Sequence, residues 1–306
     1  MTDHEAQTSG AARADVRFAV GEATTRSLSF ADDLDAYRAG GAQGIGIVAG
    51  SAAVGINGLD GRSSADSLAR FRDSGLQATF CFPQIQTIQP FSLSPGSDDP
   101  ATRIAQICDG IRLLAQFEPV CCGCGPGPLA GRERGRAEEE AAAGLKQVAR
   151  AAADVGVTIA IEPMHASMSD HWSFVTTIPD AINLLRQIDE PNTGMIVDVW
   201  HLWDTPDLVK HIHEHVEDIV GVHVNDWREP TRSWCDRVLP GDGVADVPAI
   251  LGALDRAGYD GWLEVEIFSD DGTYGDDFPD SLWKRDPVEL VRSAREKTLA
   301  AWTSRR

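Results

Sequence analysis

The chain has 306 residues, of which 42% are hydrophobic and 24% charged, a composition typical of a folded globular protein of one large domain or two small ones. The 47 acidic residues outnumber the 27 Lys and Arg and give a formal net charge of −20; since no basic run offsets this charge, we expect no nucleic-acid partner. No stretch approaches the ~18 apolar residues that a membrane-spanning helix needs, so we expect no membrane partner either.

Residues 1–14 are polar and rich in small residues, without the apolar segment of a secretory signal. We therefore expect a flexible polar tail over 1–14, followed by a single catalytic domain over 15–306, in a cytoplasmic protein with reduced thiols. The cysteine cluster at 121–124 (CCGC) lacks the two-residue spacer and the second cluster of a zinc or redox site. We interpret it as core packing.

Short apolar runs alternate along the chain with amphipathic segments, which predicts buried parallel strands separated by helices. In chain order the predicted elements are strand 18–20, helix 30–41, strand 44–48, helix 64–73, strand 78–82, helix 101–116, strand 119–123, helix 136–155, strand 158–162, helix 179–188, strand 195–198, helix 207–215, strand 219–223, helix 247–257, strand 262–266 and helix 287–301.

Capping residues support several of these boundaries. Ser29 is placed to cap the first helix, Pro100 and Pro287 suit first helical turns, and the phrase AGYDG at 257–261 ends a helix directly before a strand. Eight strand–helix alternations favour an α/β fold made of a single (β/α)₈ TIM barrel, and no GxGxxG motif follows the first strand to support a dinucleotide-binding sheet.

The loops and strand ends of such a barrel predict where its chemistry lies. We expect the longest loops at 83–99, 126–134 and 269–286, all at the C-terminal face, where barrel enzymes build their active sites. The last four strands end in polar residues that would meet at that face: Glu162, Asp198, His223 and Glu266.

Three carboxylates brought together would repel one another, and a divalent cation relieves that repulsion. Three oxygens and one imidazole suit one Mn²⁺-like ion, with Mg²⁺ or Co²⁺ as alternatives. Any single one of these residues could instead be a helix cap or a loop residue, but four at corresponding positions favour a metal site. Glu264, two residues before Glu266, points to the same face of its strand.

Phrases in the C-terminal half carry a family resemblance: IEP at 161–163, DVWH at 198–201, HVND at 223–226, DRVLPGDG at 236–243 and GYDGWLEVEIF at 258–268. On these the chain resembles the xylose-isomerase-like superfamily, to which tagatose/psicose 3-epimerases, hydroxypyruvate isomerase, inosose dehydratase and endonuclease IV belong. The resemblance implies that Glu162, Asp198, His223 and Glu266 bind the metal. It also implies that Glu162 and Glu266 act as an acid/base pair on a sugar substrate.

By the same resemblance, His201 and Arg237 hold substrate oxygens. His165 either contacts substrate or caps a loop. Trp200, with Trp203 and Trp227, either lines the pocket or packs in the core. Arg132, Arg134 and Arg136 either meet a substrate phosphate or are solvated.

The expected function is therefore metal-dependent isomerisation or epimerisation of a keto-sugar or sugar phosphate through an enediolate. The alternative is a lyase on the same scaffold: an inosose-type dehydratase, or a subunit that removes the aglycone of a 3-keto-glycoside or C-glycoside beside a small partner chain. A non-catalytic sugar-binding barrel is the third reading, and a homo-oligomer is also compatible with the sequence. Endonuclease activity is disfavoured, because the third and fourth strands carry no histidine and Val238 follows Arg237 where those enzymes have one.

Overall fold

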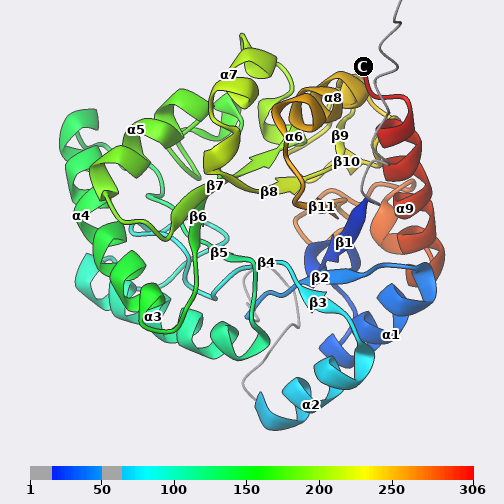
Figure 1. Ribbon diagram of the computed structural model, residues 1–306, viewed down its shortest axis with the longest axis horizontal. Helices are drawn as coiled ribbons and strands as arrows, with labels where there is room; N and C mark the ends of the chain where they lie inside the picture. Colours follow the sequence, from blue (N-terminus) through cyan, green and yellow to red (C-terminus); the bar gives the residue numbers. More distant parts are fainter. Residues whose placement is uncertain (1–15, 50–63) are drawn as a thin grey trace, which may run out of the picture.

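The computed structural model describes residues 16–49 and 64–306, so the tail predicted over 1–14 lies outside the described residues. Within them, nine parallel strands form one sheet in the order β3-β2-β1-β11-β8-β7-β6-β5-β4, and the helices surround it (Figure 1). The strands are β1 (Arg17–Gly21), β2 (Gly44–Gly46), β3 (Gln77–Ala78), β4 (Phe80–Cys81), β5 (Cys121–Gly123), β6 (Ile159–Ile161), β7 (Thr193–Asp198), β8 (Ile219–His223) and β11 (Trp262–Val265).

The two edges of this sheet are neighbours in the chain, because only Thr79 separates β3 from β4. The Thr79 amide donates to the carbonyl of Ile45 on β2 (2.9 Å), and the Thr79 carbonyl accepts from the amide of Val120 before β5 (3.1 Å). The sheet therefore closes through Thr79, which confirms the predicted (β/α)₈ barrel. The strand predicted over 78–82 is split because its first part pairs with β2 and its second part with β5.

Helices follow the strands as predicted, with ends that differ by a few residues. They are α1 (Phe30–Gly40), α2 (Ser64–Ser74), α3 (Pro100–Leu114), α4 (Arg134–Ala153), α5 (Ile178–Ile188), α6 (Val199–Leu202), α7 (Leu208–Glu214), α8 (Val247–Ala257) and α9 (Pro287–Thr303). Short 3₁₀ helices are η1 (Glu22–Thr25), η2 (Ala115–Phe117), η3 (Ala166–Met168), η4 (Val216–Asp218) and η5 (Leu282–Lys284). Helices α1 and α9 pack side by side and complete the outer ring (Figure 1).

Local capping fixes the helix ends that the sequence indicated. The Ser29 hydroxyl accepts from the amide of Asp32 (3.2 Å) at the start of α1. Gly258 ends α8 with φ of 96°, and its amide donates to carbonyls of the last turn. A Cβ at this position would meet nothing within 4 Å, so the glycine is required by the left-handed backbone alone.

The barrel interior is filled by apolar side chains from several strands, among them Phe80, Cys121, Ile196 and Trp262. A second, larger apolar layer lies between strands and helices. All six cysteines are buried and unpaired, as expected for thiols that pack in the core.

One connection is longer than any that the sequence analysis singled out. The chain between β8 and α8, residues 224–246, contains the antiparallel pair β9 (Asp226–Trp227) and β10 (Arg237–Val238). The prediction that the loops after strands three, four and eight are the longest is therefore wrong. Two-residue strands are too short to produce an alternating pattern, which is why this hairpin escaped sequence reasoning.

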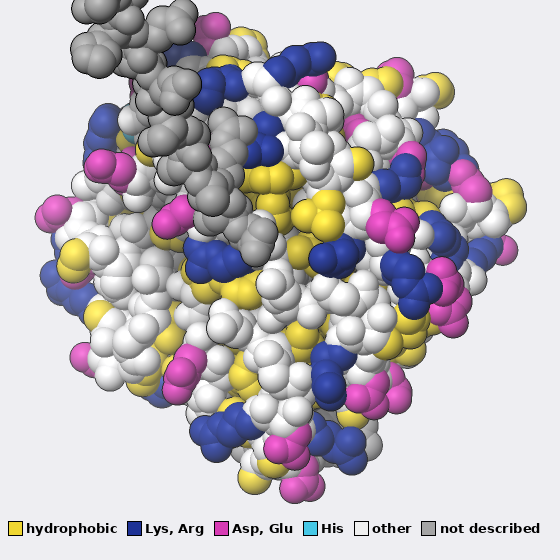
Figure 2. All heavy atoms as spheres, turned by 45° about the vertical axis from the view of Figure 1, so that its right-hand side comes forward, with side chains coloured by type: hydrophobic (Ala, Val, Ile, Leu, Met, Phe, Trp, Pro, Cys, Tyr) yellow, Lys and Arg dark blue, Asp and Glu magenta, His cyan; other side chains and the backbone are white. Residues whose placement is uncertain are grey.

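The face in Figure 2 shows acidic and basic side chains interspersed among apolar and neutral ones. Helix α4 illustrates the pairing, since Arg134 and Arg136 contact Glu138 and Glu140 one turn ahead. No helix in the described part of the chain is long and apolar enough to cross a membrane.

Candidate metal centre

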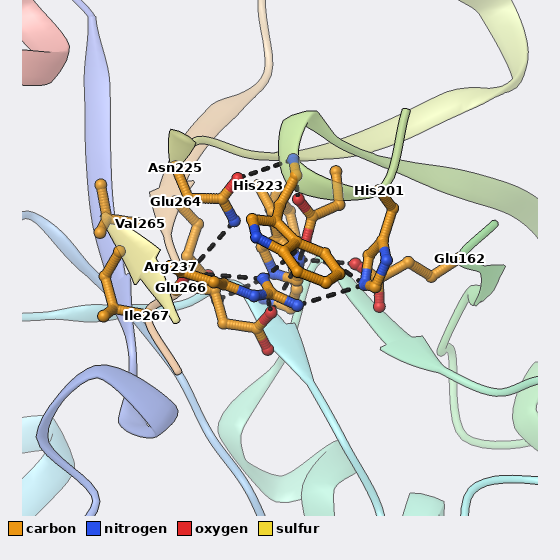
Figure 3. A network of polar contacts seen from close by, with 12 residues as sticks. Glu162, His201, His223, Asn225, Arg237, Glu264, Val265, Glu266 and Ile267 are labelled. Atoms are coloured by element: carbon orange, nitrogen blue, oxygen red, sulfur yellow. Dashed lines mark hydrogen bonds and ion pairs between the residues drawn. The ribbon is translucent and has the colours of Figure 1, made fainter. Parts of the chain in front are cut away.

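Four polar side chains converge at the C-terminal end of the barrel. Asp198 and His223 are the last residues of β7 and β8 and stand directly opposite each other in the parallel register. Glu162 follows β6 and Glu266 follows β11. One ligand atom from each of the four lies within 4.8 Å of all the others, so the structure brings together the complete predicted ligand set. Figure 3 labels Glu162, His223 and Glu266 of this set.

His223 is at the centre of the cluster. Its Nδ1 lies 2.8 Å from Glu162 Oε1, 3.7 Å from Glu266 Oε2 and 3.8 Å from Asp198 Oδ2. The imidazole and the Asp198 carboxylate are fully buried. Three carboxylate oxygens around one imidazole nitrogen fit a divalent cation.

Arg237, from β10, supplies a permanent positive charge beside these carboxylates. Its Nη1 lies 2.8 Å from Asp198 Oδ2 and 2.8 Å from Glu266 Oε2, and its side chain is 1% exposed. Burial alone would raise the pKa of Asp198, but Arg237, His201 and His223 together hold that pKa below its usual value.

Glu266 and His223 respond differently to the same surroundings. Burial raises the pKa of Glu266 to about 7, even though His223 and Arg237 act to lower it. Burial would lower the pKa of His223, but the carboxylates of Glu266 and Glu162 outweigh it and raise that pKa well above its usual value. Without a bound metal ion, Glu266 can therefore gain or lose a proton near neutral pH.

His201, on α6, reaches the pocket with a defined ring orientation. Its Nδ1 accepts a hydrogen bond from the backbone amide of His165 (2.9 Å), and burial lowers its pKa to about 3. Because a backbone amide can only donate, the neutral ring carries its proton on Nε2. That atom lies 3.2 Å from Nη2 of Arg237. Both nitrogens are then donors and do not bond to each other, but both side chains line the pocket and can donate to the same acceptor there.

A pocket of about 110 Å³ opens above the cluster. Glu162, Glu266, His201 and Arg237 all line it, and its apolar walls come from loops at the C-terminal face. Their aromatic side chains are Phe82, Phe91, Trp172 and Phe268. Sequence reasoning did not single out these four, because an aromatic residue in a loop has the same local signature as one that packs in the core.

His165 and Trp200 do not line this pocket. The rings of His165 and Trp200 each lie 4.6 Å from the ring of Trp227, and Trp203 packs 5.8 Å from that same ring. This stack lies behind His201, which it supports through the amide of His165. The structure thus places the predicted tryptophans in a packed aromatic cluster.

The three arginines considered for phosphate binding also lie outside the pocket. Arg132 and Arg136 contact Glu140, and Arg134 contacts Glu138 and Asp180. These contacts occupy the guanidinium groups at and just before the first turn of α4.

Asn225 and Asp226, in the HVND phrase, shape the site without lining it. The Asn225 amide oxygen accepts from the amide of Trp200 (2.8 Å), and its nitrogen donates to the carbonyl of Glu266 (3.2 Å). The Asp226 carboxylate accepts from the amides of Gly241, Gly243 and Ala245 at 2.9–3.0 Å. The PGDG turn is therefore held by Asp226, and Asn225 ties α6 to the end of β11.

Known proteins share this architecture. The ketose 3-epimerase of Arthrobacter globiformis is 28% identical over 136 residues, 44% of this chain and 43% of that protein. Inosose dehydratase of Geobacillus thermodenitrificans is 30% identical over 142 residues, 42% of this chain and 46% of that protein. The rhizopine catabolism protein MocC of Rhizobium meliloti is 31% identical over 160 residues, 47% of each chain. The chain thus spans about half the length of the curated relatives it matches.

A solved structure from Sinorhizobium meliloti superimposes with a TM-score of 0.79 at 25% identity, covering 93% of this chain and 98% of that one. The model of the xylose isomerase-like TIM barrel family matches residues 34–295. The chain therefore belongs to the xylose isomerase-like TIM barrel family.

Proposed function

We propose that this protein is a divalent-metal-dependent isomerase or epimerase of a keto-sugar, with Glu162 and Glu266 as its acid/base pair. The observation that carries the proposal is the convergence of Glu162, Asp198, His223 and Glu266 within 4.8 Å at a pocket. A ketose 3-epimerase among the relatives supports the substrate class. When bound, a divalent ion, Mn²⁺ in our proposal with Mg²⁺ or Co²⁺ as alternatives, would stabilise negative charge on a substrate carbonyl oxygen.

The two glutamates approach the cluster from different strands. In the sheet, β8 and β7 lie between β11, which precedes Glu266, and β6, which precedes Glu162. One carboxylate removes the proton next to the substrate carbonyl, and the other returns a proton to the opposite face of that carbon or to the neighbouring carbon. His201 Nε2–H and the Arg237 guanidinium bind the substrate oxygens.

The pocket favours an unphosphorylated substrate. Among the described residues that line it, Arg237 carries the one permanent positive charge, and its Nη1 already contacts Asp198 and Glu266. Within the described lining, a phosphate would therefore meet no free cation apart from the proposed metal ion and would face aromatic walls, at a high desolvation cost.

A lyase is the second candidate, because inosose dehydratase is among the relatives. It would share the first step, removal of the proton next to the carbonyl. A leaving group on the adjacent carbon would then depart, as water or as an aglycone, with a carboxylic acid of the site donating its proton.

Metal content and solvent exchange test the proposal. We expect about one metal ion per chain by elemental analysis in the wild type, little in His223→Ala, and wild-type content in the surface control His213→Ala. In deuterated buffer with Mn²⁺, we expect deuterium next to the carbonyl of keto-sugars, and loss of this exchange in Glu162→Gln and Glu266→Gln.

Product mass then separates the candidates, because isomerisation conserves mass and elimination does not. A wild type that binds no divalent metal and exchanges no proton would overturn the proposed function.

A further inference from the structure

A fourth carboxylate, Glu264, lies inside the barrel beneath the three carboxylates of the candidate metal centre. It belongs to β11, where it pairs in register with His223 of β8, and it is 1% exposed. Its Oε1 lies 3.4 Å from Nε2 of His223. It is not one of the four side chains whose ligand atoms cluster, so the proposed reaction leaves its role open (Figure 3).

The two ring nitrogens of His223 face different surroundings. Nδ1 points to the carboxylates of Glu162, Asp198 and Glu266. Nε2 is buried and has no hydrogen bond within the described residues, with Glu264 as its ion-pair neighbour. A neutral imidazole has one N–H and one bare nitrogen, and only the bare nitrogen can bind a metal ion.

The Glu264 carboxylate is itself held in place. The Thr79 hydroxyl donates to Oε2, and the amide of Phe80 reaches the same oxygen at 3.4 Å. Thr79 is the residue through which the barrel closes, so its position is set by backbone bonds on both sides.

Two glycines leave the space that this carboxylate occupies. A Cβ on Gly46 of β2 would overlap Oε1 of Glu264, and a Cβ on Gly21 of β1 would lie 2.9 Å from it. Both strands thus lack a side chain where Glu264 lies. Burying a carboxylate in the interior of a barrel is costly. Two strands nevertheless leave room for Glu264, and Thr79 donates a hydrogen bond to it. We therefore expect Glu264 to have a role other than packing.

We propose that Glu264 is a positioning residue for the metal centre: with a metal ion bound, Glu264 would accept a hydrogen bond from Nε2–H of His223, from which it lies 3.4 Å away here, and would so leave Nδ1 bare and directed towards the cluster of carboxylates. The inference rests on the metal binding in the proposed function. Carboxylates that orient a metal-binding histidine in this way commonly strengthen metal binding by roughly 10- to 100-fold.

The test compares Glu264→Leu, which has no acceptor, with Glu264→Gln, whose side-chain oxygen can still accept from Nε2–H. Zn²⁺ affinity of metal-free protein is measured by chelator competition, with the exposed Glu296→Gln as control. We expect Zn²⁺ to bind at least about 10-fold more weakly to Glu264→Leu, with Glu264→Gln in between. Urea unfolding of metal-free protein checks that the variants are folded. Glu264→Leu leaves the buried Thr79 hydroxyl without its acceptor and should be less stable than the wild type, whereas Glu264→Gln keeps an acceptor there and should lose less. Affinities are compared under conditions in which each variant is fully folded.

A second readout locates the proton directly. In ¹⁵N-labelled, zinc-loaded wild type, side-chain NMR should show the proton of His223 on Nε2. Wild-type Zn²⁺ affinity in Glu264→Leu, or a proton on Nδ1, would overturn this inference and leave the proposed function standing. Absence of Zn²⁺ binding to the wild type would instead overturn the proposed function.

Discussion

Arg237 shows how one side chain can organise the site. Its guanidinium contacts Asp198 and Glu266 through Nη1 and lies beside His201 through Nη2. It also lies over the rings of Trp200 and Phe268, at 5.1 and 5.0 Å. A planar guanidinium group can contact the two carboxylates, the imidazole and the aromatic rings at the same time, whereas the ammonium group of a lysine is a single point charge.

We therefore expect Arg237→Lys to lower kcat/KM about 100-fold, a loss of about 2.7 kcal/mol in transition-state stabilisation. Steady-state kinetics on the keto-sugar identified by deuterium exchange measures this, with the exposed Arg186→Lys as control. Equal values of kcat/KM for Arg237→Lys and the wild type would show that the guanidinium geometry contributes nothing to catalysis.

Two buried carboxyl groups, Glu22 in η1 and Asp33 in α1, lie near the N-terminal end of the described chain. Glu22 accepts from the amide of Val48 (2.6 Å), and Asp33 on α1 accepts from the hydroxyl of Thr25. Both carboxyl groups are buried, and Tyr37 joins the network through Thr25. Burial raises the pKa of Asp33 to about 8, and burial and the charge of Asp33 raise the pKa of Glu22 well above its usual value.

These raised pKa values predict how stability depends on pH. Between the usual carboxyl pKa of 3.8 and the folded value of about 8, the folded chain keeps a proton that the unfolded chain releases. The unfolding free energy should therefore fall as pH rises through this window, by up to about 1.4 kcal/mol per pH unit for each proton.

Asp33→Asn cannot release this proton, so we expect its slope to be shallower than that of the wild type. Urea unfolding at about pH 5, 6.5 and 8 measures the slope, with the exposed Asp35→Asn of the same helix as control. An unchanged slope in Asp33→Asn would show that Asp33 ionises normally in the folded protein.

Among the secondary-structure elements, the β9–β10 hairpin connects the barrel to the site. Its first strand begins at Asp226, three residues past the candidate ligand His223, and its second strand begins at Arg237. The Asp226 carboxylate joins this hairpin to the following turn through three backbone amides. Gly243 is required there, because a Cβ would overlap the backbone of Trp227 and the carboxylate of Asp226.

Asp226→Ala would leave these amides without their acceptor, so we expect the free energy of unfolding to fall by about 3 kcal/mol. Because the turn positions Arg237, kcat/KM should fall as well. Asp242→Ala in the same turn is the control, since Asp242 is exposed and makes a surface ion pair with Lys297. Equal urea midpoints for the two variants would contradict this role for Asp226.

For the whole molecule, charge links metal binding to stability. The chain carries a formal net charge of −20, and three carboxylates of the candidate centre come within a few ångströms of one another. A divalent ion that binds the folded chain there relieves part of this repulsion and stabilises that state by mass action.

At a metal concentration of about 100 times Kd, the gain is about 2.7 kcal/mol, which raises Tm by about 5 °C in a chain of this size. Thermal unfolding after treatment with EDTA, and again after adding Mn²⁺, measures the change. His223→Ala should lose most of the increase. An equal increase in that variant would place the stabilising ion elsewhere.

Much of this protein could be predicted from local sequence. The alternation of apolar runs and amphipathic segments indicated the barrel, and residues such as Ser29 and Gly258 marked helix ends. The four candidate ligands were identifiable because parallel strands of a barrel all end at one face. Each of these signals depends on a residue and its near neighbours, which is why the sequence alone carries them.

Other features depend on segments far apart in the chain. Glu264 is held by Thr79, 185 residues away, and the space for it comes from glycines of β1 and β2. Only barrel closure brings these strands together. The same closure placed Phe82 and Trp172 on the pocket wall and His165 and Trp200 behind it. Strand and helix periodicity says which face of an element is buried, but the partner that it meets there is decided by the tertiary structure.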